Sequence, residues 1–227
     1  MSISRALPLG ITALLASLAA FAALAFSNGP EAQAHVHAAT PTGTTTITRK
    51  ELVLRRDMRR LWEDHVTWTR LAVISLTTGS PDTDATVARL LRNQSDIGNA
   101  IKAFYGTAAG NALTRELRLH ILIAADVIAA AKAGDQAKLA DAQARWQQNA
   151  VDIAELLHRA NPRHWPRAAL QAMLEEHLRL TTQEVVARLQ GDWNADVAAY
   201  DRIHVHALHM ADTLSSGLVK QFPRRFR

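Results

Sequence analysis

The amino-acid sequence predicts an all-α fold, an antiparallel bundle of about six helices in which four long helices form the core. Apolar residues recur at alternating gaps of four and three, the spacing that places one stripe along a helix. Helix-capping residues, with glycines and prolines that end helices, divide the chain into six such segments. No strand-like alternation of useful length is present, so we expect no sheet.

Capping signals place the individual helices. Thr48 with Glu51 forms a capping box that opens the first helix. Ser80 is expected to cap the second, with Pro81 in its first turn, and a bend or restart is expected at 93–96. Asp135 and Asp192 are expected to cap the fourth and sixth helices. The six helices are then expected over about residues 49–78, 81–105, 107–133, 136–160, 166–190 and 193–222.

Histidines lie on the apolar stripes of four of these helices. They are His65 in the first helix, His120 in the third, His177 in the fifth, and His206 or His209 in the sixth. If they lie at a similar depth, their rings converge in the bundle core. Neutral imidazole is a good ligand for Zn, Cu, Ni or Fe, and bundle cores hold such sites between facing helices.

A carboxylate accompanies one of these histidines. Glu116 lies one turn before His120 on the same side of the helix, where it could bind a metal or orient an imidazole ring. The alternative is a purely structural core, because a buried histidine needs a hydrogen-bond partner and Thr69, Thr181 and Glu184 could supply one. Both interpretations stay open at the level of sequence.

The first 46 residues have the pattern of an export signal followed by a linker. Residues 1–34 combine a positive start, an apolar run over 6–26 and an Ala-x-Ala cleavage site that ends at Ala34. An uncleaved membrane anchor is the alternative, since the run is just long enough to span a bilayer. Either way the domain is expected outside the cytoplasm, in the periplasm or secreted. Residues 35–46 are expected to form a flexible linker.

Cleavage after Ala34 would create a second candidate metal site. The mature chain would begin His35-Val36-His37. Its free amine, two backbone amides and the imidazole of His37 can surround Cu(II) or Ni(II) in a square plane, with His35 as the first residue. The alternative is two histidines in an unstructured leader.

Composition restricts the remaining functions. The chain has no cysteine, which excludes disulfides and thiolate metal sites, and it carries a net charge of +5. Basic residues gather at 49–60 and in the tail 224–227, which follows the bundle domain 47–223. We interpret them as solvated surface and expect no nucleic-acid partner, because aromatic residues are not interleaved with them. A membrane partner is expected only if the N-terminal segment is retained.

Several segments resemble a family of small exported all-helical bacterial proteins of unknown function. The resemblance covers about residues 50–225, and it is carried by LWEDHVTWTR, NAIKAFYG, LHILIAA, EEHLRLTTQEVVARLQGDW and the closing MADTL with KQFP. Similar sequences bear the labels acetylglutamate kinase and glycosyltransferase, chemistry that would need an α/β sheet or phosphate-binding glycines. The resemblance implies that the segments around His65, His120 and His177 belong together. It supplies no reaction.

Three functional hypotheses follow. The first is a non-enzymatic extracytoplasmic bundle that binds or senses a divalent transition metal through its core histidines. The second is an envelope structural or interaction module whose histidines only complete a polar core. The third is an enzyme that uses a His/Glu pocket, for which no nucleophile–base signature is found in the sequence.

Overall fold

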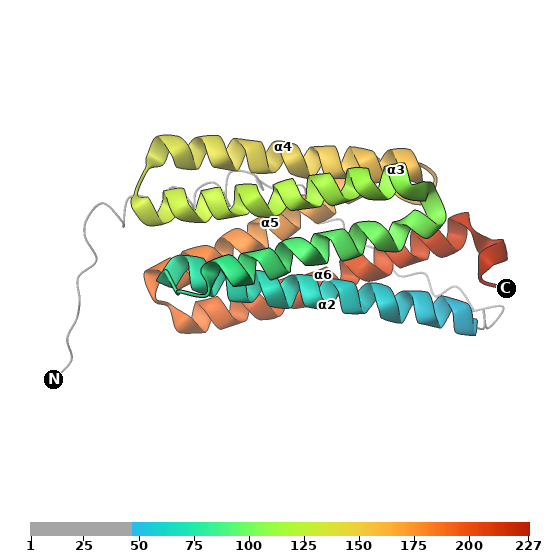
Figure 1. Ribbon diagram of the computed structural model, residues 1–227, viewed down its shortest axis with the longest axis horizontal. Helices are drawn as coiled ribbons and strands as arrows, with labels where there is room; N and C mark the ends of the chain where they lie inside the picture. The colour runs from blue at the N-terminus through green and yellow to red at the C-terminus, as the bar shows by residue number, and fades with distance from the viewer. Residues whose placement is uncertain (1–46) are drawn as a thin grey trace, which may run out of the picture.

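A computed structural model describes residues 47–227 as a bundle of α-helices aligned along one long axis (Figure 1). The helices are α2 (Arg49–Thr78), α3 (Thr83–Ala133), α4 (Gln136–Ala160), α5 (Arg167–Gln190) and α6 (Trp193–Gln221), followed by the 3-10 turn η1 (Pro223–Arg225). The predicted all-α class is confirmed, and no strand occurs in the described range. Helix α2 packs against α3 and α6, α4 packs against α3 and α5, and α5 packs against α6.

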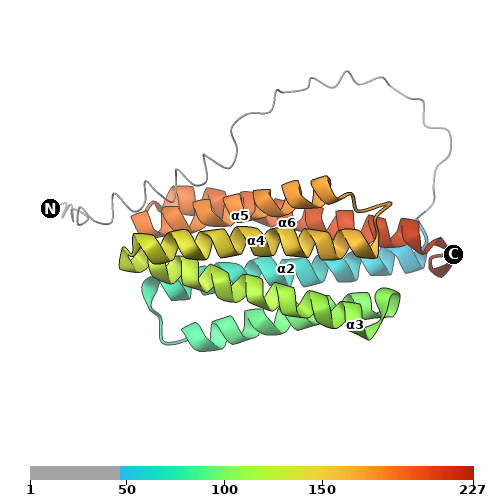
Figure 2. The ribbon, with the colours of Figure 1, turned by 90° about the horizontal axis from the view of Figure 1, so that it is seen from above.

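Helix α3 is the element that the sequence analysis divided differently. Five α-helices are found in residues 47–227 instead of six, because the expected second and third helices run together as α3. The chain nevertheless reverses at Gly106, whose φ of 82° and ψ of 171° are not helical. Figure 2 shows the two arms of α3 running back alongside each other from this point. Only glycine adopts such a positive φ without strain, so Gly106 sets the reversal.

The two arms of α3 approach each other closely at a pair of glycines. A Cβ atom added at Gly98 would lie 2.7 Å from the carbonyl oxygen of Gly110, and one added at Gly110 would lie 2.6 Å from the carbonyl oxygen of Gly98. Neither distance is compatible with a side chain, so this contact requires glycine on both arms. The sequence analysis assigned no role to either residue.

Three of the predicted helix starts are confirmed and one is wrong. Thr48, Asp135 and Asp192 accept hydrogen bonds at the N-termini of α2, α4 and α6, from backbone N–H groups 3.2, 3.1 and 3.0 Å away. Helix α3 begins at Thr83, with Asp82 rather than Ser80 at the N-cap position. Ser80 instead belongs to the preceding turn, where its carbonyl oxygen accepts a hydrogen bond from the Thr83 hydroxyl.

The bend expected at residues 93–96 is also absent from α3. The helix is continuous there, and Asn93 and Gln94 are fully buried against α2. The Asn93 side chain donates a hydrogen bond to the Leu61 carbonyl oxygen at 3.0 Å, which explains how two amides are tolerated in a core position. Asn93 and Gln94, whose polarity suggested a break in the helix, therefore mediate a contact between α3 and α2.

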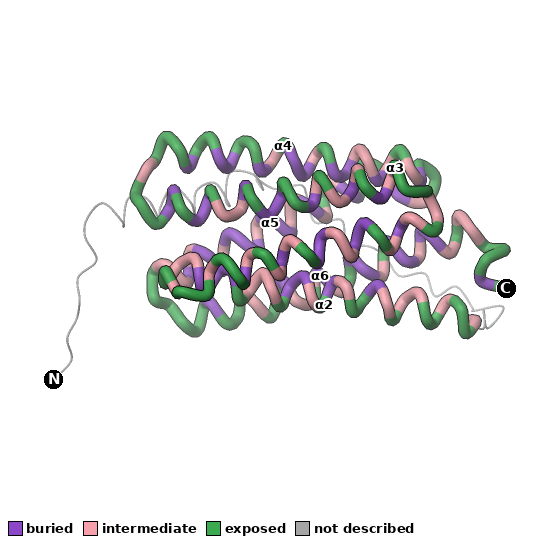
Figure 3. Tube along the Cα trace, viewed as in Figure 1, coloured by how far each residue is buried: buried purple, intermediate pink, exposed green. Residues whose placement is uncertain are grey.

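Most of the buried apolar residues form one cluster that all five helices share, and two small clusters lie beside it, around Leu90 and around Val185; Figure 3 shows buried positions on each of the helices. The stripe expected in the first helix was Leu54, Met58, Leu61, His65, Trp68 and Ala72. Met58, His65 and Ala72 are buried as expected, whereas Leu54, Leu61 and Trp68 are only partly buried and Trp62 and Val66 are buried beside them. At the chain's end Phe226 is buried, with its ring stacked on that of Phe104 at 6.1 Å. Within residues 47–227, none of the helices has the length and apolar character needed to cross a membrane.

We predict that Gly98→Ala destabilises the protein although alanine is the better helix former. Propensity alone favours alanine by about 1 kcal/mol in a helix interior. The added methyl group meets the backbone of the other arm, and such overpacking typically costs about 1–3 kcal/mol. Urea unfolding followed by circular dichroism measures the difference. The exposed neighbour Asn99 is the control, because Asn99→Ala should be neutral or slightly stabilising; a Gly98→Ala protein as stable as this control would contradict the close approach.

Candidate functional site: a buried histidine cluster

Four histidines from four helices lie next to one another in the core. His65 of α2, His120 of α3 and His177 of α5 are each 4% exposed. The ring of His177 lies between the others, with centroids 5.8 Å from His65, 5.9 Å from His120 and 6.3 Å from His206 of α6. A cavity of about 20 Å³ is bordered by the first three rings. The sequence-predicted histidines are thus brought together around His177.

Both ring nitrogens of His120 are committed to hydrogen bonds. Its Nδ1 lies 2.8 Å from Oδ1 of Asn149, and its Nε2 accepts from the Trp146 indole N–H at 3.2 Å. Because an indole N–H can only donate, Nε2 must be the unprotonated nitrogen, and Nδ1 carries the proton. The Asn149 amide in turn donates to the carbonyl and carboxylate oxygens of Glu116, both at 3.2 Å. Helices α3 and α4 are therefore joined by one chain of hydrogen bonds.

His65 is held by the buried amide of Gln94. The Gln94 amide nitrogen lies 3.2 Å from Nδ1 of His65 and donates to the carbonyl oxygen of Leu90 at 2.9 Å. The Leu90 carbonyl oxygen can only accept a hydrogen bond, so the side-chain atom of Gln94 that faces it must be the amide nitrogen and not the amide oxygen. Nδ1 of His65 then accepts, and its proton resides on Nε2.

Three buried polar atoms beside this cluster have no hydrogen-bond partner within the described residues. They are Nδ1 of His177, Oε1 of Gln94 and Nε1 of Trp62, and all three residues line the cavity of about 20 Å³. Unsatisfied buried groups cost about 1–3 kcal/mol each. A cavity of this size has room for one water molecule or one ion. The site therefore offers a donor, an acceptor and one uncommitted imidazole nitrogen to a single small occupant.

Burial keeps the histidines neutral. Desolvation lowers the pKa of His65 and of His120 to about 4, and that of His177 well below its ordinary value. The titratable groups that lower the pKa of His177 further are other histidines, namely His65, His120 and His206. The pKa of His206 is also lowered by burial, although the hydrogen bond from its Nε2 to the Met173 carbonyl and the nearby Glu176 oppose this.

The other proposed ligands are placed differently. Glu116 reaches the cluster only through Asn149. His209 is exposed on α6. His35 and His37 lie outside the described residues. Within residues 47–227, no group of three or more His, Asp or Glu side chains is arranged ready to hold a metal ion.

The hydrogen-bond partners of the core histidines differ from those expected from the sequence. The partners expected for them were Thr69, Thr181 and Glu184, but Thr181 bonds to the backbone carbonyl of His177, and the Thr69 hydroxyl has no partner in the described range. The actual partners are Gln94, Asn149 and Trp146. A signal for Asn149 existed, because it lies three residues after Trp146 and four before Ile153, on the same face of α4.

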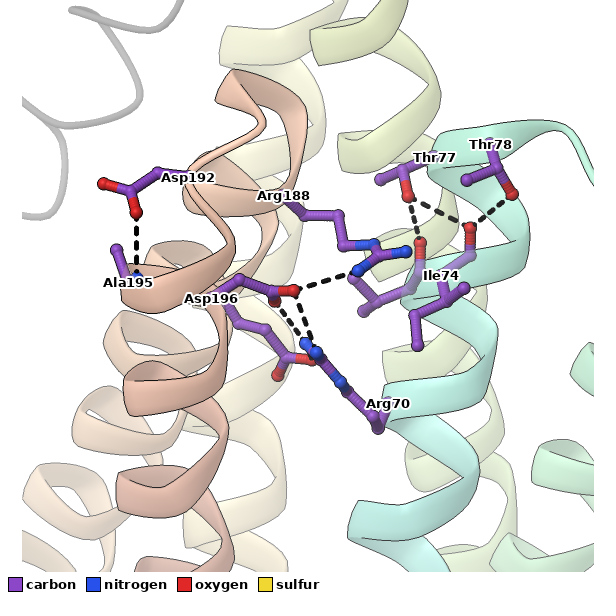
Figure 4. A network of polar contacts seen from close by, with 10 residues as sticks. Arg70, Ile74, Thr77, Thr78, Arg188, Asp192, Ala195 and Asp196 are labelled. Carbon is purple, nitrogen blue, oxygen red and sulfur yellow. Dashed lines mark hydrogen bonds and ion pairs between the residues drawn. The ribbon is translucent and has the colours of Figure 1, made fainter.

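A second buried polar cluster joins α2, α5 and α6. Figure 4 shows Arg70 and Arg188 directed towards Asp196 between these helices. Arg70 bonds to both carboxylate oxygens of Asp196 and to Glu184 at 2.9 Å, and Arg188 bonds to Asp196 at 3.0 Å. The Arg70 guanidinium also lies 5.3 Å from the Tyr200 ring centroid. Two guanidinium groups thus neutralise two buried carboxylates.

The two carboxylates respond differently to this environment. Burial raises the pKa of Glu184, against the opposing effect of Arg70. For Asp196 burial acts in the same direction, but the hydrogen bonds from Arg70 and Arg188 outweigh it and lower the pKa. Such clusters fix helix positions because breaking one pair leaves a charge buried and unpaired. We assign this cluster a structural role.

The fold and the cluster define a class: an all-helical bundle with neutral histidines buried in its core. Comparison of the chain with known protein families, with curated proteins and with solved structures gave no significant match. Function must therefore be argued from the site itself.

We predict that the protein loses stability as pH falls from about 6.5 to about 4. Unfolded histidines bind protons below about pH 6.5, whereas folded His65 and His120 do not until about pH 4. The unfolded chain binds more protons in this window, so acid favours unfolding by about 1.4 kcal/mol per pH unit for each histidine. Urea unfolding across this range measures the slope.

Two variants test whether the pH dependence of the free energy of unfolding comes from the buried histidines. His177→Leu should reduce the pH dependence by the contribution of one histidine, because it removes a buried ring. His209→Gln, which changes an exposed side chain, should retain the full dependence. A free energy of unfolding that is constant between about pH 6.5 and about pH 4 would show that the rings are not buried as neutral groups.

Proposed function

We propose that the protein is an exported, non-enzymatic helical bundle that binds one divalent transition-metal ion in its core, with His177 as the principal ligand. The observation that carries this proposal is the Nδ1 atom of His177, which is buried, has no partner among the described residues and belongs to a cavity with room for one ion. In the tautomer of His177 that carries its proton on Nε2, this buried Nδ1 has a free lone pair that is available for coordination.

The neighbouring groups supply suitable further ligands. His206 has a ring centroid 6.3 Å from that of His177, and metal–nitrogen bonds of about 2 Å on either side of one ion allow a separation of this size, although His206 itself does not border the cavity. His65 borders the cavity, but its unprotonated Nδ1 accepts from Gln94, so it would bind an ion only if that hydrogen bond were broken. Because Nε2 of His206 donates to a carbonyl, its Nδ1 holds the lone pair. The amide oxygen of Gln94 is unpartnered and could complete the set. Imidazole nitrogen with a neutral oxygen suits Zn, Cu, Ni or Fe.

His120 is not part of this ligand set. Its unprotonated nitrogen accepts from Trp146, so coordination would break that bond and leave a buried indole N–H without a partner. Its contribution is to close one side of the cavity and to position the ring of His177, 5.9 Å away. In this proposal His177 and His206 are therefore the histidine ligands, and His65 and His120 are supporting residues.

One observation favours a second candidate function. The Trp62 indole N–H belongs to the same cavity and has no partner in the described residues. It can donate to a water molecule but not to a cation. One buried water could accept from Trp62 and donate to Gln94 and His177, which would make the cluster a completed structural core. The protein would then be an envelope structural or interaction module without a metal.

Metal binding is tested on the exported protein, whose intact mass is expected to show a chain that begins at His35. Elemental analysis after purification should find one transition-metal ion per chain. In titrations with Zn(II), His177→Ala should weaken binding by about tenfold or more, comparable to the loss of a supporting residue at a metal site. His209→Ala should bind as the parent does, because this ring is exposed.

A further variant distinguishes metal binding by the N-terminal histidines from metal binding by the core. His37→Ala removes the imidazole of the candidate Cu(II) and Ni(II) site and should not change Zn(II) affinity. If His177→Ala binds Zn(II) as tightly as His209→Ala, the core is not the site. A protein that binds no metal, and whose thermal stability Zn(II) does not raise, would instead support the water-filled core.

A further inference from the structure

The charges of the bundle are sorted between its two ends. Residues 49–57, 159–167 and 220–227 contain eleven Arg and Lys but only two carboxylates. The start of α2, the connection between α4 and α5 and the C-terminus bring these segments to one end of the bundle (Figures 1 and 2). We call this the basic end. The three turns at the opposite end, 79–84, 134–138 and 191–196, contain five Asp and one Lys.

Direct contacts hold the basic end together. Lys50 Nζ donates to the backbone oxygen of Arg227 at 2.8 Å, which joins the start of α2 to the C-terminus. The Arg225 guanidinium lies 5.3 Å from the Phe104 ring centroid, beside the reversal of α3. Gln221 donates to the Ala160 carbonyl oxygen at the end of α4, at 3.0 Å. Segments far apart in sequence therefore form one cationic surface.

Several of these cations oppose local helix preferences. Arg49 and Lys50 begin α2, and Arg167 begins α5, whose first turn has no acidic residue. A helix N-terminus carries partial positive charge, so cations there are unfavourable. Arg49, Arg163 and Arg224 are also exposed, and no ion pair to them is found within residues 47–227. Arg167 is paired with Glu155 at 2.7 Å, whereas Arg49, Arg163 and Arg224 are left as exposed cations that an external anionic partner could bind.

Exposed apolar side chains accompany this charge. Ile47, Leu52 and Val53 are 56%, 60% and 39% exposed near the start of α2. A shallow groove of about 530 Å³ lies beside them, lined by Arg49, Lys50, Val53, Phe104, Arg225 and Phe226. Cations interspersed with exposed aliphatic side chains are typical of surfaces that bind at the boundary between headgroups and acyl chains.

We infer that the basic end docks on the surface of a membrane that contains anionic phospholipids. The chain enters α2 at this end, so the apolar run 6–26 tethers it there during export, whether or not that run is later removed. Arginine and lysine bind lipid phosphates, and the exposed aliphatic residues enter the headgroup region. The acidic turns at the opposite end then point away from the membrane. The long axis of the bundle is therefore roughly perpendicular to the membrane surface.

Vesicle binding tests this docking with the exported chain. Its affinity is compared for phosphatidylcholine vesicles and for vesicles in which about a third of the lipid is phosphatidylglycerol. Any contribution of the N-terminal segment is common to both, so their difference reports headgroup charge. Anionic vesicles should bind at least about tenfold more tightly, and added salt should reduce the difference because it screens exposed charges.

Matched charge reversals locate the binding surface. Arg49→Glu, Arg163→Glu and Arg224→Glu together should weaken binding to anionic vesicles by about a hundredfold or more. Arg60→Glu, Arg92→Glu and Arg115→Glu change the net charge equally on exposed sides of the bundle and should retain most of the affinity. Circular dichroism checks that both variants fold.

Three outcomes would overturn the inference. Equal affinity for neutral and anionic vesicles would show that headgroup charge is not recognised. Equal loss in the two triple variants would show that net charge matters and the basic end does not. Binding to a DNA duplex without binding to anionic vesicles would assign this surface to a different kind of polyanion.

Discussion

All five helices contribute residues to a buried cluster around neutral imidazole rings, in which His65, His120 and His206 are hydrogen-bonded. Burying a polar group without a partner costs several kcal/mol, and burying a charged one costs more. Helix α4 supplies no histidine to the set, yet its Asn149 and Trp146 satisfy both nitrogens of His120. Gln94 does the same for one nitrogen of His65 across α2 and α3. The relative positions of the helices follow from these bonds, because a shift of one helix would leave a ring unpaired.

Charged and neutral polar groups are kept apart along the bundle. The histidine core is neutral, whereas the cluster of Arg70, Glu184, Arg188 and Asp196 lies closer to the acidic end and is ionised and paired. Because two guanidinium groups face two carboxylates, the cluster tolerates burial that would be costly for a single ion pair. At the basic end, Arg49, Arg163 and Arg224 are exposed and have no ion pair within residues 47–227. The buried charged groups are thus stabilised by ion pairs, and the buried histidines avoid the cost of burying a charge by remaining neutral.

The fold class could be predicted from the sequence because helical periodicity and capping are local properties. Thr48, Asp135 and Asp192 cap the helices as expected, since an N-cap bond involves residues only three positions apart. The convergence of four histidines could also be anticipated from their stripe positions. Their partners could not, because the bonds of Gln94 and Asn149 span helices. The boundary expected at Gly106 is present as a non-helical residue where the two arms of α3 meet, because a glycine after a helical stretch is a local signal. The Gly98–Gly110 contact could not be predicted, because it depends on tertiary packing.

The measurement that tests the central claim most directly is nitrogen-15 NMR of the histidine side chains near neutral pH, which distinguishes neutral tautomers from the charged ring. The account predicts a neutral His120 with its proton on Nδ1, because Nε2 accepts from Trp146. His65 should carry its proton on Nε2 and stay neutral well below pH 6.5, the ordinary pKa of histidine. A His120 protonated on Nε2, or core rings that become charged near pH 6.5, would contradict the hydrogen-bonded neutral core.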